Sequence, residues 1–185
     1  MGKGWSAQGR RRRMPAVNTD PTEGPMTDTT TLAAARVLAP EDGDRARFFA
    51  DDIVVKERRG AFDIWTAEIH AGCEPPMHIH HREDEWLCVI EGRITAFVDG
   101  AEIAVGAGSI GFLPRGVAHT YAVDTGVARM IAINSPGGFA SMFGDVERAF
   151  AGEMPDAPRP QDGAVMGPVF EAYGIEMVGP NPRYA

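Results

Sequence analysis

Residues 72–92 hold the densest chemistry of the chain and read GCEPPMHIHHREDEWLCVIEG. Three of the five histidines lie in this stretch. Alternate side chains of a β-strand share a face, so we expect His78 and His80 to point the same way. A tight link over residues 82–84 lets the next strand bring Glu85 to the same place. Two imidazoles and a carboxylate that converge in this way predict a site for a divalent transition metal.

A second segment, residues 108–123, offers one more candidate ligand and reads GSIGFLPRGVAHTYAV. Pro114 and Gly116 predict a turn, because proline fixes φ and glycine accepts a positive φ. Apolar residues on both sides of the turn predict a pair of strands. His119 is therefore expected just past a bend, near the start of a strand, where it can complete the ligand set.

The two segments resemble the paired motifs of the cupin superfamily. The first motif, G-x5-H-x-H-x4-E-x6-G, is matched by Gly72, His78, His80, Glu85 and Gly92. The second motif, G-x5-P-x-G-x2-H-x3-N, is matched by Gly108, Pro114, Gly116 and His119. Val123 stands where the family has its final Asn, a position that is not a metal ligand. Within the superfamily, the HREDEW and FLPRGVAH segments most resemble small quercetin-dioxygenase-like cupins.

The resemblance implies an all-β fold, the cupin double-stranded β-helix or jelly-roll barrel. It also implies that His78, His80, Glu85 and His119 hold one divalent transition metal. The candidates for this metal are Fe, Mn, Ni, Co, Cu and Zn. An octahedral ion on four side chains keeps open positions, which is the arrangement of a catalytic site rather than a closed structural one.

Short runs of β-branched and aromatic residues, separated by regular turn signals, support this fold without the resemblance. The predicted strands are residues 52–56, 61–70, 77–81, 85–90, 93–98, 101–105, 110–113, 117–123 and 128–134. Many short strands of this kind predict a sandwich or barrel. We place the barrel domain at residues 41–136.

After Pro136 the apolar period changes from that of a strand to that of a helix. One helical stripe is formed by Phe139, Met142, Phe143, Val146 and Phe150. A second helix is predicted over residues 164–173, or from Pro168 if that proline takes the first helical position. Residues 175–178 form a short apolar end piece. Residues 137–185 are thus predicted to be a helical extension that packs on the outside of the barrel or on a partner subunit.

Residues 1–40 differ from the rest of the chain. Polar residues, proline and glycine follow a basic run at 10–13, so a disordered tail is predicted, with a possible helical turn at 29–38. The arginines do not indicate an export signal, because no apolar segment follows them. Translation from Met26 is an alternative that the sequence leaves open.

Composition excludes several classes of partner. The net charge is −8 and the body has no basic stripe, which argues against nucleic acid. No apolar run is long enough for a membrane span. Cys73 and Cys88 are the only cysteines and form no repeated C-x-x-C pattern, so we expect free thiols and a cytoplasmic protein.

Strand parity predicts the environment of the other candidate residues. Tyr121 shares a face with His119 and carries a hydroxyl that needs a partner when buried, so it is the candidate substrate contact. His81 is expected to face away from the site, and His70 to be structural. In the turn, Glu83 and Asp84 are expected to be solvated charges, with a contact behind a metal ligand as the alternative.

The side chains that point outward from the strand at 85–90 are apolar, so we expect another part of the protein or a second subunit to cover this face. Trp86, Cys88 and Ile90 alternate with the inward Leu87 and Val89, so the outer face is apolar. Together with the apolar stripe of the C-terminal extension, this favours a homodimer.

Three functions are consistent with these residues. The first is a metal-dependent dioxygenase for a flavonol-like or enolic aromatic substrate, in which Glu85 is both a ligand and the base that accepts the hydroxyl proton. The second is a non-catalytic metal or small-molecule binding or sensor protein. The third is another cupin reaction, such as isomerisation or decarboxylation. In each case the partner is a small molecule, and metal content with O₂ uptake separates the first two.

Overall fold

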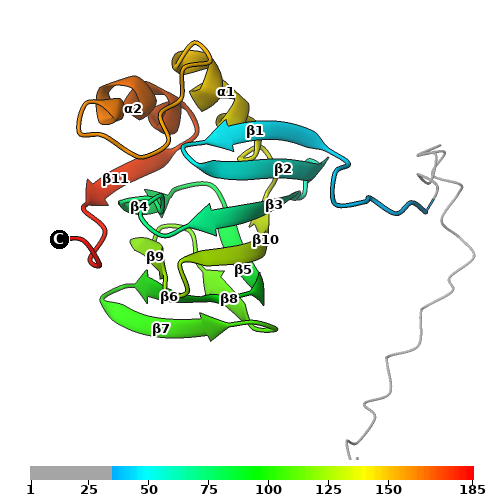
Figure 1. Cartoon of the computed structure of the whole chain (residues 1–185), viewed down its shortest axis with the longest axis horizontal. Helices are drawn as coiled ribbons and strands as arrows, with labels where there is room; N and C mark the ends of the chain where they lie inside the picture. Colours follow the sequence, from blue (N-terminus) through cyan, green and yellow to red (C-terminus); the bar gives the residue numbers. More distant parts are fainter. Residues whose placement is uncertain (1–34) are drawn as a thin grey trace, which may run out of the picture. The chain divides into compact units, whose positions relative to one another are not determined.

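The computed structural model of the protein describes residues 35–185. Most of the predicted tail, and most of the predicted helical turn at 29–38, lie outside the described residues. The described chain forms two antiparallel sheets (Figure 1). The strands are β1 (Asp44–Phe48), β2 (Asp51–Arg58), β3 (Asp63–His70), β4 (Met77–His80), β5 (Asp84–Glu91), β6 (Arg93–Val98), β7 (Ala101–Gly106), β8 (Ile110–Leu113), β9 (His119–Val123), β10 (Val127–Ser135) and β11 (Ile175–Gly179).

The sheets face each other with the core between them. The larger has the order β1-β2-β3-β10-β5-β8, and the smaller the order β11-β4-β9-β6-β7. Inward residues such as Leu87, Val89 and Ile94 are almost completely buried. This is the two-layer architecture of a jelly roll, so the predicted all-β fold is confirmed.

Every strand predicted from the sequence is present, with ends within two residues of the expected ones. β1 was missed, because its sequence DRARF is mostly polar and exposed and carries no β-branched residue. The predicted end piece is β11, which pairs with β4 in the smaller sheet.

Two helices follow the barrel strands, as predicted. They are α1 (Ser141–Ala149) and α2 (Asp162–Ala172). The alternative start of the second helix at Pro168 is wrong, because this proline lies inside α2. Burial of Met166 and Phe170 on the same helix offsets the hydrogen bond that proline cannot donate.

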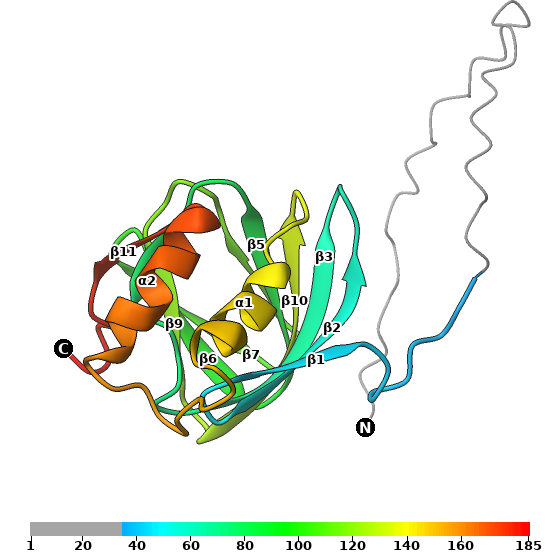
Figure 2. The same cartoon turned by 90° about the horizontal axis from the view of Figure 1, so that it is seen from above.

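The helices lie across one end of the sheets (Figure 2). α1 presents Met142 and Phe143, and α2 presents Phe170, to the cavity that holds the candidate site. The extension therefore does more than cover the outside of the barrel, because it supplies part of the wall of that cavity.

Glycine is required where β5 turns into β6. Gly92 has a φ of 83°, and a Cβ there would lie 2.7 Å from the backbone oxygen of Val127. Any other residue would strain this turn and push on the neighbouring loop. The motif glycine is thus explained by close approach of two backbones.

The outer face of the larger sheet carries exposed apolar side chains. Ile90 is 53% exposed and Phe112 is 50% exposed, while the ring of Trp86 packs on Phe112 with centroids 5.1 Å apart. No helix among residues 35–185 is long and apolar enough to cross a membrane.

A buried carboxylate connects the barrel to the start of α1. Asp63 at the start of β3 is fully buried, and its Oδ2 accepts hydrogen bonds from the backbone amides of Gly138 (2.8 Å) and Ala140 (2.9 Å). These bonds fix Phe139, whose ring lies 4.9 Å from that of His80. Asp63 therefore helps to position both the helix and one wall of the site.

We expect Asp63→Ala to lower the free energy of unfolding by about 1–3 kcal/mol, because it removes the acceptor of two backbone amides, of which that of Ala140 is buried. Asp63→Asn should cost less, since its carbonyl oxygen can still accept both bonds. Urea denaturation measures the effect, with Asp52→Ala on the exposed face of β2 as the control. A loss in Asp63→Ala no larger than in the control would contradict this role.

Candidate metal centre

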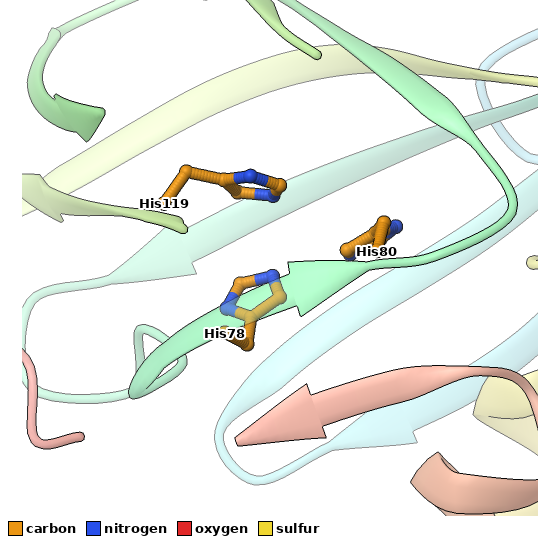
Figure 3. A group of neighbouring side chains, drawn as sticks. All are labelled: His78, His80 and His119. Atoms are coloured by element: carbon orange, nitrogen blue, oxygen red, sulfur yellow. The ribbon is translucent and has the colours of Figure 1, made fainter. Parts of the chain in front are cut away.

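Two neighbouring strands bring three histidines together. His78 and His80 lie on β4, and His119 begins β9, directly opposite His78 in the antiparallel register. One ring nitrogen from each residue lies within 4.8 Å of the others, and all three side chains are buried. Figure 3 shows the three rings around a common space. The predicted convergence of these histidines is therefore present.

Backbone carbonyls set the tautomers of two of the rings. Nδ1 of His78 lies 2.8 Å from the oxygen of Pro76, and Nδ1 of His119 lies 2.8 Å from the oxygen of Val117. A carbonyl oxygen only accepts, so each Nδ1 carries the proton and each Nε2 keeps its lone pair. Within residues 35–185, Nε2 of His119 is buried with no hydrogen-bond partner.

Burial also keeps the three rings neutral. It lowers the pKa of His78 to about 4, with a further contribution from His119. Burial, followed by the charges of His78 and His119, lowers the pKa of His80 to about 2. The pKa of His119 is lowered as well, mainly by burial. A neutral imidazole is the form that binds a metal, so the site offers three ligands at neutral pH.

Glu85 lies beside the histidines and is held from behind. Its Oε2 is 4.0 Å from Nε2 of His119. The carboxylate oxygens of Glu85 are not within 4.8 Å of the ligand nitrogens of all three histidines. Nδ2 of Asn134 donates to Oε1 at 3.2 Å, and Nε1 of Trp65 donates to Oδ1 of Asn134 at 2.8 Å. Burial raises the pKa of Glu85 to about 7, against the effect of Asn134. Its predicted role as the fourth ligand remains a proposal.

Glu83 is buried rather than solvated, so the expectation of a solvated charge was wrong for this residue. Its Oε2 lies 3.8 Å from Nδ1 of His80, and neither atom has a hydrogen-bond partner in the described part of the chain. A small movement would pair them and fix the tautomer of the third ring, as carbonyls do for the others. Burial raises the pKa of Glu83.

Asp84, in the same turn, connects the two motifs. It accepts hydrogen bonds from the backbone and the guanidinium of Arg115, with a shortest contact of 2.7 Å. The amide of Gly116 donates to the oxygen of His80 at 2.8 Å. The turn before His119 is thereby fixed against the strands that carry Glu85 and His80.

The histidines form one wall of a mostly apolar cavity, which Asp51 and Glu85 also line. Tyr121, which sequence parity placed beside His119, also lines it, and its role as a substrate contact remains a proposal. Leu87 and Val89 are buried core residues. This lining suits a small, largely apolar molecule.

Some residues of the site were not identified from the sequence. Asn134 and Trp65 position Glu85 from two other strands, and only the strand pairing reveals them. Asp51 lines the cavity at the start of β2. Its position two residues before the inward Ile53 could have indicated from the sequence that Asp51 also points inward. His81 faces away as predicted, with Nε2 2.8 Å from Oε2 of Glu176.

The donor set fits a divalent transition metal. Three neutral imidazoles surround one space, a buried lone pair on His119 has no partner, and the carboxyl of Glu85 is adjacent. Such a set can bind a borderline ion and leave coordination positions open toward the cavity.

Comparisons with known proteins agree with this site. The chain is 25% identical over 134 residues to quercetin 2,3-dioxygenase of Bacillus subtilis (strain 168), which covers 70% of this chain and 40% of that protein. The chain thus spans less than half the length of this relative. KdgF from Halomonas sp. matches with a TM-score of 0.53 at 14% identity, over 58% of this chain and 98% of that chain.

A further solved structure, an RmlC-like cupin from Shewanella frigidimarina NCIMB 400, matches with a TM-score of 0.49 at 21% identity, over 56% of this chain and 93% of that chain. The family model described as Cupin domain, Cupin_2, matches residues 65–134, which contain the three histidines and Glu85. Residues 65–134 of the chain are thus similar to the cupin domain family.

Proposed function

We propose that the protein is a metal-dependent dioxygenase for a flavonol-like or other enolic aromatic substrate. The observation that carries this proposal is the group of three neutral imidazoles beside a buried carboxyl at the wall of an apolar cavity. Similarity to quercetin 2,3-dioxygenase supports the substrate class. O₂ is the co-substrate, and because both of its atoms enter the product, no external reductant is needed.

In this proposal His78, His80 and His119 hold the metal, and Glu85 adds a carboxylate oxygen. A divalent ion bound there supplies Lewis-acid and redox chemistry. Glu85 also accepts the proton of the substrate hydroxyl. Asn134 occupies one of its oxygens and leaves the other toward the histidines, where it can accept a proton.

The walls of the cavity have a separate role. Phe139, Phe143 and Phe170 line it together with Trp65. Aromatic rings of this kind can pack on the faces of a flat aromatic substrate. They also exclude water, which strengthens the hydrogen bonds made inside the site.

O₂ uptake tests the proposal directly. Protein loaded with Fe(II), Mn(II), Ni(II) or Co(II) should consume O₂ when quercetin is added, and metal-free protein should not. An oxygen electrode measures the uptake. If no metal form consumes O₂ with any enolic aromatic, the dioxygenase is excluded in favour of a binding or sensor protein, or of an isomerase or decarboxylase.

His80→Ala should weaken metal binding by on the order of 100-fold, because it removes a buried ligand whose loss no neighbour replaces. Competition with a chromophoric chelator gives the affinity. His81→Ala is the matched control, because it removes an adjacent exposed imidazole and should leave the affinity unchanged. Equal affinities of the two variants would exclude His80 as a ligand.

Glu85→Gln should lower turnover by roughly 100-fold or more while most of the metal is retained. The glutamine oxygen can still contact a metal, but it cannot take up a proton at neutral pH. Metal analysis and O₂ uptake on the same samples separate the two effects, with Glu91→Gln at the exposed end of β5 as the control. A parallel loss of metal and turnover would mean that Glu85 is a ligand and not the base.

A further inference from the structure

A second polar position lies in the cavity on a different sheet from the histidines. Asp51 begins β2 in the larger sheet, whereas the three histidines lie on β4 and β9 of the smaller one. Asp51 is 1% exposed, and it lines the same cavity as His78 and Tyr121. It continues the inward face of Ile53, so the strand itself directs it inward.

One oxygen of Asp51 is fixed by its neighbour His70. The backbone amide of His70 donates to Oδ1 at 2.8 Å, and Nδ1 of His70 lies 3.0 Å from the same oxygen. The imidazole side chain is 41% exposed, so its other edge reaches solvent. His70 is therefore the residue that positions Asp51.

The other oxygen of Asp51 has no such partner. Within residues 35–185, Oδ2 accepts no hydrogen bond. It also differs from polar atoms such as Oδ1 of Asp63, which lack a partner and are completely buried. The residue is 1% exposed and lines the cavity, which is consistent with Oδ2 facing the cavity. A buried carboxylate oxygen of this kind needs a hydrogen-bond donor.

Other buried carboxyls of the fold show what a structural role looks like. Glu74 uses both oxygens, accepting from the amides of Val123 and Gly72 at 2.6 Å each. Asp162 uses both oxygens on Arg159. Asp51 keeps one oxygen unpaired among residues 35–185, as Asp63 does, but Oδ1 of Asp63 is fully buried, whereas Asp51 lines the cavity.

The surroundings of Asp51 explain what it can accept. Burial raises its pKa to about 6, although the hydrogen bonds from His70 oppose this shift. Near it the cavity is lined by apolar groups such as Phe48, Ile53 and Ile69. A neutral donor such as a phenolic hydroxyl suits this position, because it satisfies the carboxylate without bringing a charge into an apolar space.

We propose that Asp51 is a second substrate-binding position, which accepts a hydrogen bond from a hydroxyl group of the bound molecule remote from the group at the histidines. This inference rests on the proposed function and narrows its substrate class to aromatic compounds with more than one hydroxyl. Asp51 determines specificity, and His70 acts only through Asp51.

The test compares quercetin, which carries additional phenolic hydroxyls, with unsubstituted flavonol, which lacks them. Dissociation constants are measured anaerobically by absorbance titration of the full metal-loaded chain. We expect Asp51→Asn to weaken quercetin binding on the order of tenfold, and flavonol binding by less than about twofold. Asp52→Asn, on the exposed face of the same strand, should change neither constant.

The role of His70 in positioning Asp51 is tested by the ratio of the dissociation constants for flavonol and quercetin. His70→Leu removes the side-chain donor and should lower the preference for quercetin, whereas His70→Gln, which keeps a donor, should restore it. Urea denaturation of all variants shows whether the fold is intact. If Asp51→Asn keeps the wild-type preference, or if Asp52→Asn loses it equally, the proposal is overturned.

A second pair of probes keeps this inference separate from the proposed function. If neither flavonol binds the wild type, the proposed function fails, and phenol and toluene are titrated instead by NMR. The ratio of phenol to toluene affinity should be larger in the wild type than in Asp51→Asn. Equal ratios would overturn the role of Asp51 whatever the reaction is.

Discussion

Hydrogen bonds from two imidazoles to backbone carbonyls just before their strands determine which ring nitrogens are free to bind a ligand. In His78 and His119, Nδ1 is bound at 2.8 Å to the carbonyl oxygen two residues earlier, at Pro76 and Val117. Both rings are thereby fixed in one tautomer with the lone pair on Nε2. Pairing of β4 with β9 then places these nitrogens opposite each other. The metal-binding geometry follows from backbone structure.

The C-terminal extension completes what these strands begin. β11 pairs along β4, with Ile175 opposite His80 and Met177 opposite His78, and both residues line the cavity. The helices close the end of the barrel, and Asp63 fixes the start of α1 from the barrel side. The histidines come from the segment that the cupin model matches, whereas much of the cavity wall lies beyond it. Both parts of the chain therefore contribute to the cavity wall.

Much of this could be predicted from the sequence, because period two places His78 and His80 on one face and the motif spacing adds His119. The burial of Glu83 could not, since a charged residue in a turn is normally solvated and only its position behind His80 reveals a role. β1 was missed because its side chains are mostly polar, and the role of Asp51 depends on the distant His70. These missed features depend on contacts between residues or strands that the local sequence pattern does not reveal.

A carboxylate oxygen directed into an apolar cavity costs stability until a donor reaches it. An ion could satisfy the three histidines on the smaller sheet, but Asp51 lies on β2 of the larger sheet, and an ion at the histidines would not supply its hydrogen-bond donor. A molecule long enough to reach both sheets would satisfy both positions at once. Because such a molecule binds the folded state alone, it also stabilises the fold in proportion to its affinity. The polar groups on the two sheets thus favour a ligand that carries polar groups at more than one position.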